Sequence, residues 1–175
     1  VQDKIYDSFV KDFINKANHI KLGPGDDFET QMGPLVSSSQ REKVLSYIEK
    51  AKLEGARILC GGKIPANPEL KKGFYFEPTV ISGVNPEMSI FKEEIFGPVA
   101  LVMKFSDIEE AIKLANSSDF ALAACVWSKD TLKAKEVAAS LNSGTVWINT
   151  YGMFLDEIPY GGFKQSGFGK ELGRD

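Results

Sequence analysis

Two adjacent carboxylates stand directly before an apolar run, in Glu93-Glu94-Ile95-Phe96-Gly97-Pro98 followed by residues 99–105. The run is typical of a buried strand, and strand interiors disfavour both Glu and Pro. The Gly-Pro corner should turn the chain so that the preceding side chains leave the end of the strand, where α/β proteins usually bind ligands. A carboxylate there can accept two hydroxyl hydrogen bonds at once. The alternative for Glu94 is a solvated acid near a strand end, and Glu93 is more typical of a structural residue.

Neither of the two cysteines has the surroundings that a nucleophile needs. A catalytic thiolate requires an electropositive or dipolar, partly exposed setting. Cys125 lies in the apolar run 123–127, and Cys60 ends a short apolar run before two glycines. Both are predicted to be packing residues, and their spacing fits no metal site. His19 stands alone at a helix end, where its charge would suit the helix dipole. We therefore predict no catalytic residue and no metal ligand.

The glycine-rich tail, residues 160–170, resembles a phosphate-binding loop only superficially. Gly167 is followed by Phe168, and Lys170 is followed by Glu171 rather than by Ser or Thr. The dinucleotide pattern also fails, because Leu172 stands where its third glycine should be. The tail is therefore predicted to be a tight, irregular turn, and an ATPase-like domain is excluded.

The first half of the chain contains two predicted helices and two short strands. Apolar residues recur at helical spacing before a turn-rich link at 22–34. Ser39 and Glu42 form a predicted capping box for the next helix, which Gly55 should end. The short apolar runs are 57–60 and 75–81, and a Gly/Pro-rich loop separates them. The residues of the two apolar helix faces are Ile5, Phe9, Val10, Phe13, Ile14 and Ala17, then Val44, Leu45, Ile48 and Ala51.

The second half alternates strands and helices regularly. Predicted strands at 99–105, 123–127 and 145–149 are separated by two apolar helical stripes. Ser106 with Glu109 and then Asp130 are the predicted helix starts, and Gly144 is the predicted end of the second helix. This order predicts an α/β fold with a parallel-sheet βαβαβ core, its three strands in one sheet and its helices covering it.

Composition limits the class of protein. The chain has 175 residues, of which 43% are hydrophobic, so it can build one domain with a sizeable core. Its net charge of −3 and interspersed charges argue against a nucleic-acid surface. We find no signal peptide and no long apolar span, so no membrane contact is predicted. With two cysteines and no disulfide pattern, a reducing cytoplasm is the expected location.

Three segments in order resemble one enzyme family. They are Glu93-Glu94-Ile95-Phe96-Gly97-Pro98-Val99, then Gly144-Thr145-Val146-Trp147-Ile148-Asn149, then Pro159-Tyr160-Gly161-Gly162-Phe163-Lys164-Gln165-Ser166-Gly167. Together they closely resemble the NAD(P)-dependent aldehyde dehydrogenases. The resemblance covers nearly the whole chain, including Gln31-Met32-Gly33-Pro34-Leu35 and Tyr75-Phe76-Glu77-Pro78-Thr79-Val80.

The resemblance implies that residues 1–175 are a partial catalytic domain. The family's cofactor domain, nucleophilic cysteine, general-base glutamate and oxyanion-hole asparagine would all lie upstream, and its oligomerisation strand would lie downstream. The parent would be an oxidoreductase that oxidises an aldehyde to a carboxylic acid with NAD or NADP, through a cysteine thiohemiacetal and thioester. It would form a homo-oligomer.

The resemblance also implies roles for four residues. Glu94 would bind the nicotinamide ribose hydroxyls, and Phe96 would pack beside the nicotinamide. Phe154 and Tyr160 match positions that line the aldehyde channel. The loop at 151–154 suits an apolar aldehyde and suits equally a cation held over ring faces, and its aromatic residues could instead pack into a core or a subunit interface.

A second hypothesis assigns the chain to another class, a non-catalytic α/β interaction or oligomerisation module. It agrees with the expected lack of nucleophile and base in residues 1–175. On either hypothesis this segment alone is expected to be inactive, whereas the parent protein is an enzyme only on the first.

Overall fold

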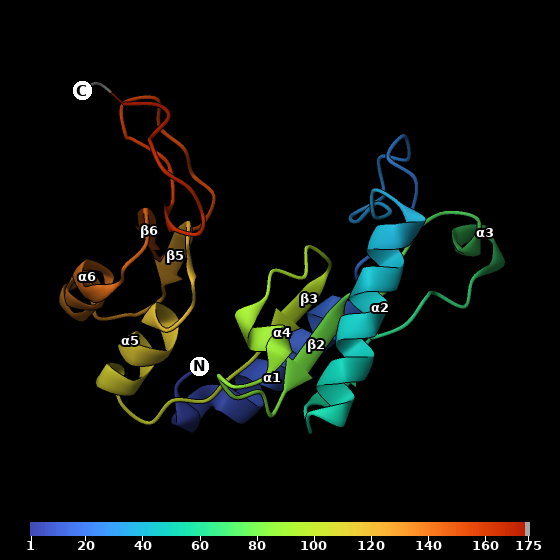
Figure 1. The fold of residues 1–175 in the computed structure, drawn as a ribbon, viewed down its shortest axis with the longest axis horizontal. Helices are drawn as coiled ribbons and strands as arrows, with labels where there is room; N and C mark the ends of the chain where they lie inside the picture. Colours follow the sequence, from blue (N-terminus) through green and yellow to red (C-terminus); the bar gives the residue numbers. More distant parts are fainter. Residues whose placement is uncertain (174–175) are drawn as a thin grey trace. The chain divides into compact units, whose positions relative to one another are not determined.

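The computed structural model describes residues 1–173 and has an α/β architecture (Figure 1). The chain divides into two compact units, Val1–Phe105 and a second that begins at Ser106. Within the described residues, no helix combines the length and the apolar character needed to cross a membrane.

A three-stranded mixed sheet is the centre of the first unit. Its strands run in the order β1-β2-β3, with β1 antiparallel and β3 parallel to β2. The elements of this unit are α1 (Asp3–Asn18), α2 (Ser38–Leu53), β1 (Arg57–Cys60), α3 (Pro68–Lys71), β2 (Thr79–Ser82), α4 (Ser89–Lys92) and β3 (Val99–Leu101).

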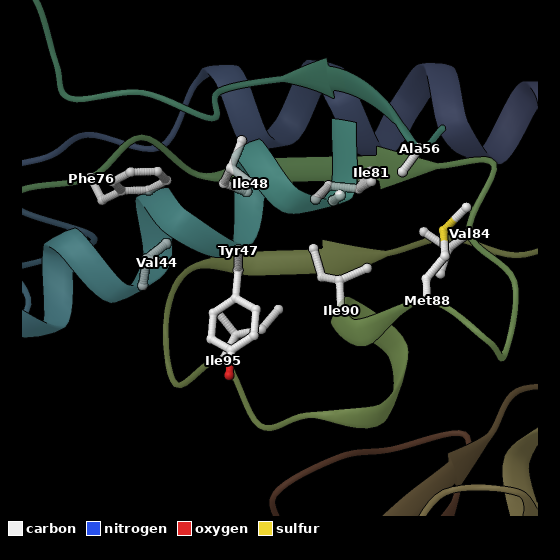
Figure 2. Packing of buried hydrophobic residues seen from close by; sticks show 11 residues of the cluster. Val44, Tyr47, Ile48, Ala56, Phe76, Ile81, Val84, Met88, Ile90 and Ile95 are labelled. Carbon is white, nitrogen blue, oxygen red and sulfur yellow. The ribbon is translucent and has the colours of Figure 1, made fainter. Parts of the chain in front are cut away.

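Strand β2 is buried along its whole length because helices cover both of its faces. Ile81 belongs to a cluster built on α2, and its neighbour Val80 belongs to a smaller cluster built on α1. Successive strand residues point to opposite faces, so α1 and α2 lie on opposite sides of the sheet. Figure 2 shows the larger group, called the α2 cluster below, which comprises Val44, Tyr47, Ile48, Ala51, Ala56, Phe76, Ile81, Val84, Met88, Ile90 and Ile95.

The N-cap of helix α2 lies two residues earlier than predicted. Ser37, not Ser39, is the N-cap, and its hydroxyl accepts a hydrogen bond from the Gln40 backbone N–H. The predicted end at Gly55 is confirmed: its φ is 97°, and the next residue, Ala56, donates back to the Ala51 carbonyl. This is the left-handed ending that favours glycine.

The second unit contains a parallel βαβ unit, as predicted. Strands β5 and β6 pair in parallel, from Ala123 opposite Thr145 to Val126 opposite Ile148, and α6 packs against both. A separate antiparallel pair joins β4 to β7. The elements are α5 (Ile108–Asn116), β4 (Phe120–Ala121), β5 (Ala123–Val126), α6 (Thr131–Ser140), β6 (Thr145–Ile148) and β7 (Phe163–Lys164).

The prediction that strands 99–105, 123–127 and 145–149 form one parallel sheet was wrong. Strand β3 pairs with β2 in the first unit, whereas β5 and β6 form their own sheet in the second. The predicted strand at 99–105 is also shortened, because its last residue, Phe105, bonds to the chain start instead, with Val1 and Asp3 as backbone partners. Alternation of elements along a sequence does not specify which strand edge is free to pair.

Two predicted helix boundaries in the second unit need correction. Asp107, one residue after Ser106, caps α5 through the Glu110 backbone N–H, whereas Asp130 caps α6 as predicted. Gly144 does not end α6, which stops at Ser140. A Cβ at Gly144 would collide with the Gly161 carbonyl, so close packing explains this glycine.

Candidate functional site

One side of residues 93–97 is fixed to helix α2. The Tyr47 hydroxyl donates a hydrogen bond to Glu93 Oε2 at 2.6 Å. Ile95 is buried in the α2 cluster, where Figure 2 shows it with Tyr47. Gly97 approaches Val44 so closely that an added Cβ would lie 2.6 Å from Val44 Cγ2. The structural role expected of Glu93 is therefore confirmed.

Glu94 and Phe96 alternate with the residues that contact α2, and both are exposed. The Phe96 side chain is 74% exposed, an unusual setting for a large aromatic residue beside a packed cluster. Among the described residues, no hydrogen bond or ion pair occupies the Glu94 carboxylate. Its oxygens thus remain available to accept hydrogen bonds from a hydroxyl-bearing ligand.

Phe96 has a strained backbone that Gln40 of α2 holds in place. Its φ is 55°, the left-handed region that costs a non-glycine residue about 1–3 kcal/mol. Gln40 Nε2 donates to the carbonyl oxygens of both Ile95 and Phe96, at 2.8 and 2.9 Å. A strained backbone persists only where its surroundings hold it in place. Here the Gln40 amide supplies two hydrogen bonds that do so.

An open hollow of about 450 Å³ lies beside this segment. It is mainly apolar, and one of its walls is the Phe96 ring. A flat aromatic ring could rest against that wall, within the same stretch of chain that carries Glu94. The lining residues are Pro34, Leu35, Val36, Gln40, Phe96 and Gly97.

Glu93 interacts with two side chains of helix α2, Tyr47 and Lys50. The hydrogen bond from Tyr47 to Glu93, the partial burial of the phenol and the negative charge of Glu93 all raise the pKa of Tyr47. Lys50 Nζ lies 4.0 Å from Glu93 Oε1, a long and exposed ion pair of little energetic weight. Glu93 is thus occupied by protein partners, which leaves Glu94 as the acid available to a ligand.

The second unit gathers the other predicted site residues into an aromatic cluster. Phe154 lies edge-on to Tyr160, with ring centroids 4.8 Å apart and planes at 89°. Trp147 meets Phe154 at 5.6 Å and Tyr151 at 5.1 Å, also edge-on. Trp147 Nε1 donates to the Met153 carbonyl at 2.8 Å and so anchors the loop to β6.

This aromatic cluster borders a cavity of about 190 Å³. Phe154 is 54% exposed, and Tyr160 is half-buried. The rings thus retain free faces that could contact an apolar group or a cation. The lining residues are Thr145, Val146, Trp147, Met153, Phe154, Leu155, Ile158, Pro159 and Tyr160.

The cysteines and the histidine have structural surroundings, with one correction. Cys60 is half-buried, and burial raises the pKa of its thiol, the opposite of what a nucleophile needs. Cys125 was predicted to be packed but is exposed, because its side of β5 is not covered within the second unit. His19 caps the C-terminus of α1 as expected, and its Nδ1 lies 2.6 Å from the Asn15 carbonyl. The described residues contain no cluster suited to a metal ion.

Two residues that fix the site, Gln40 and Tyr47, escaped sequence analysis. Gln40 stands four residues before Val44 and so extends the apolar stripe of α2. A half-buried amide on the core face of a helix needs hydrogen-bond partners, so the position of Gln40 could have predicted a hydrogen bond to another part of the fold. Nothing in the sequence identified the partners as the carbonyls of residues 95 and 96.

The chain belongs to the aldehyde dehydrogenase family, whose family model matches residues 1–175. It is 49% identical over 174 residues to betaine aldehyde dehydrogenase from Bacillus subtilis, and 46% identical over 173 residues to the enzyme of that name from Brucella melitensis. In both comparisons the match covers 99% of this chain and 36% of the relative. The chain thus spans about a third of the length of these relatives.

The fold agrees with solved structures of the same family. A crystal structure of betaine aldehyde dehydrogenase from Staphylococcus aureus in complex with NAD+ superposes with a TM-score of 0.97 at 49% identity. The match covers 99% of this chain and 35% of that chain. A structure of the same enzyme without cofactor, a point mutant, matches equally well.

Proposed function

We propose that residues 1–175 are part of the catalytic domain of an NAD-dependent aldehyde dehydrogenase, with the cofactor domain, the nucleophilic cysteine and the oligomerisation strand outside this chain. The parent protein would oxidise an aldehyde to a carboxylic acid through a cysteine thiohemiacetal and thioester. Family membership supports the reaction class, and the NAD+ complex of the Staphylococcus aureus relative supports NAD rather than NADP.

The observation that carries this proposal is the exposure of Glu94 and Phe96 on a segment whose other side is fixed. Glu93, Ile95 and Gly97 contact α2, so the outward residues have a defined direction without being buried. An exposed aromatic ring that lines a hollow, and on the same segment a carboxylate that has no partner among residues 1–173, are the groups that a nicotinamide riboside would need.

In this proposal each residue has one role. The Glu94 carboxylate accepts hydrogen bonds from the two hydroxyls of the nicotinamide ribose, each charge-assisted. The Phe96 ring limits the rotation of the nicotinamide. When bound, NAD+ supplies the hydride acceptor. The chain thereby fixes the orientation of the cofactor. This raises the rate of hydride transfer, because the reacting atoms must be held close and aligned.

The aromatic cluster is proposed to form one wall of the aldehyde tunnel, with Phe154 and Tyr160 facing the substrate. We propose a quaternary-ammonium aldehyde as the substrate class. Two observations support it: free faces on edge-packed rings attract such cations, and the relatives at 46–49% identity are betaine aldehyde dehydrogenases.

We also propose that the parent is a cytoplasmic homo-oligomer. Light scattering on the purified full-length protein measures its mass directly, and a mass equal to a single chain would contradict this part of the proposal.

The decisive test of the site is Glu94→Gln in the full-length protein, measured by steady-state and single-turnover kinetics. We expect slower hydride transfer, because the neutral amide is a weaker acceptor for two hydroxyls. Glu29→Gln is the matched control, since it neutralises an exposed acid of the first unit that lies outside residues 93–97. Unchanged hydride transfer and unchanged NAD+ affinity in Glu94→Gln would remove this residue from the site.

A second assay separates an enzyme from an interaction module. NAD+ reduction with several aldehydes is measured for residues 1–175 and for the full-length protein. We expect activity only in the latter. Activity in the segment would contradict the missing-nucleophile argument, and an inactive but well-folded full-length protein would favour the module.

A further inference from the structure

We propose that Asn149 is a positioning residue for the aldehyde-binding wall, because it sets the direction in which residues 150–154 leave strand β6 and hence where the Phe154 ring lies. The proposal rests on the function proposed above for Phe154 and Tyr160. It goes beyond that function because Asn149 does not belong to the described residues that line the cavity of the aromatic cluster. Asn149 would act through the backbone of the loop that carries the rings.

The side-chain amide of Asn149 extends the pairing of β5 and β6 past the end of both strands. Its oxygen accepts a hydrogen bond from the Ser128 backbone N–H, and its nitrogen donates to the Ser128 carbonyl, both at 2.9 Å. The last pair of the regular ladder is Val126 opposite Ile148. The amide thus takes the place of a further backbone peptide group, because it offers the same donor and acceptor.

Ser128 gives this amide a firm point of attachment. The Ser128 hydroxyl accepts a hydrogen bond from the Asp130 backbone N–H at 3.1 Å, and Asp130 is the N-cap of α6. Helix α6 in turn packs against both β5 and β6. The two amide bonds therefore attach residue 149 to the start of a packed helix.

The backbone of Asn149 turns the chain at the end of β6. Its φ is 54°, in the left-handed region that asparagine tolerates better than most residues. An extended residue would continue the strand, whereas a left-handed one changes the direction of the chain. The loop then returns to β6, where the Met153 carbonyl accepts a hydrogen bond from Trp147 Nε1 at 2.8 Å. The loop is therefore held at both ends, by the Asn149 amide and by the Trp147 indole.

The position of Phe154 depends on this loop. The Phe154 ring is 54% exposed, and its contacts with Tyr160 and Trp147 are edge-on, with centroids 4.8 and 5.6 Å apart. Loss of the Asn149 amide should let the loop shift and move this ring out of the wall. Because the rings are proposed to contact the aldehyde and not the cofactor, the expected defect is in aldehyde affinity.

The test compares Asn149→Ala and Asn149→Gly with Asn142→Ala in the full-length protein. Alanine removes the amide and disfavours the left-handed backbone, whereas glycine removes the amide but accepts that backbone and is the milder change. Asn142 is the matched control, an exposed asparagine of the same unit that bonds to Asn116 through its backbone N–H. The measurements are amide hydrogen exchange in peptides covering residues 150–155, and kcat and KM for betaine aldehyde and for acetaldehyde, which lacks an ammonium group.

In Asn149→Ala we expect faster exchange in residues 150–155 and a rise of about tenfold in the KM for betaine aldehyde, with kcat within about threefold of wild type. Asn149→Gly should change both in the same direction but less. The KM for acetaldehyde should stay within about threefold in either variant, and Asn142→Ala should match the wild type throughout. A merely structural role would lower the fraction of active protein, and hence kcat for both aldehydes, but would leave each KM unchanged.

Unchanged exchange at residues 150–155 in Asn149→Ala would overturn the proposal, and so would wild-type behaviour of Asn149→Gly, because the amide would then have no part. Asn149→Gly carries the same test if the alanine variant does not fold. Faster exchange with an unchanged KM for betaine aldehyde would also overturn it, provided that Tyr160→Leu lowers kcat/KM for that aldehyde. If neither Asn149→Ala nor Tyr160→Leu alters these kinetics, the function proposed for the aromatic cluster fails instead, which distinguishes the two failures.

Discussion

The hydroxyl of Tyr47 and the carboxylate of Glu93 are 2.6 Å apart, which fixes the residue immediately before Glu94 to the middle of helix α2. Two further contacts attach the same segment to the two ends of α2. Glu54, at the C-terminal end of α2, accepts hydrogen bonds from the Ser89 backbone and hydroxyl, and Gln40 holds residues 95 and 96 at the other end. Residues 89–97 therefore run antiparallel to α2 and are attached to it along their length.

The pair of Tyr47 and Glu93 predicts a loss of stability at alkaline pH. The raised pKa means that folded Tyr47 holds its proton more tightly than the unfolded chain, whose tyrosines titrate near pH 10.0. The stability that results is present below pH 10 and is lost as pH rises through the higher folded pKa. Unfolding free energies measured from about pH 8 to about pH 11 should fall less steeply in Tyr47→Phe.

The same substitution tests the strength of the hydrogen bond at neutral pH. Tyr47→Phe should lower the unfolding free energy by about 1 kcal/mol, a reduced value for a bond to a half-exposed carboxylate. An equal decline with alkaline pH in both proteins would contradict the assignment of the raised pKa to Glu93.

A second prediction concerns Gly97, which packs against Val44. Its φ lies outside the left-handed region, so only the lack of a side chain explains the glycine. Gly97→Ala should cost about 1–3 kcal/mol, because its Cβ would lie 2.6 Å from Val44 Cγ2. Gly25→Ala is the control, since nothing lies within 4 Å of its added Cβ.

Coupling with Val44 provides the check on this explanation. Because Val44→Ala removes the colliding methyl groups, the double variant should lose less stability than the sum of the single losses. The measurement is denaturant unfolding of the four proteins. Strict additivity would show that the cost at Gly97 has another origin.

Local signals in the sequence located most of the elements. Strand β1 has the predicted bounds, Asp130 caps α6 and Gly55 ends α2. Each of these features depends on residues within one turn of a helix or one short strand. The observed N-caps Ser37 and Asp107 lie two residues before and one residue after the predicted caps. The predictions missed because neighbouring serines and acids offer equivalent side-chain acceptors.

Contacts between distant residues were beyond the sequence alone. The pairing of β3 with β2 depends on which strand edge the fold leaves free, and no local pattern encodes that choice. The sequence analysis expected a structural role for Glu93, but it could not name the partner, Tyr47, which lies 46 residues earlier in the chain. The resemblance to a family supplied the candidate roles of Glu94 and Phe96, whereas Gln40 emerged only from the coordinates.

A third prediction concerns Lys164, which joins β7 to the end of α5. Its Nζ donates to the carbonyls of Asn116 at 2.8 Å and Ser118 at 2.7 Å. Lys164→Met should lower the unfolding free energy by about 1–2 kcal/mol, because these carbonyls lose a charged donor in a partly exposed site. Hydrogen exchange should increase in the β4–β7 pair. Lys135→Met on α6 is the control, and an equal effect there would contradict the specific role.

The last prediction tests whether the aromatic cluster recognises a cation. Betaine aldehyde and 3,3-dimethylbutanal have nearly the same shape, but only the first carries a positive charge. If the rings hold a quaternary ammonium group, the full-length enzyme should prefer betaine aldehyde, and Tyr160→Leu should lower kcat/KM for it by about tenfold. The neutral aldehyde should change less than about threefold, because leucine still fills an apolar wall.

Phe168→Leu is the matched control for this measurement, since that ring is fully exposed. It should leave both aldehydes unaffected. Equal losses for the charged and neutral aldehydes in Tyr160→Leu would mean that the ring provides only volume, and a wild-type preference for the neutral aldehyde would contradict a cation site. Tyr160 packs edge-on against Phe154, with ring centroids 4.8 Å apart, and it lies outside the buried core of the first unit. Tyr160→Leu therefore removes a ring face from the aromatic cluster without creating a cavity in that core.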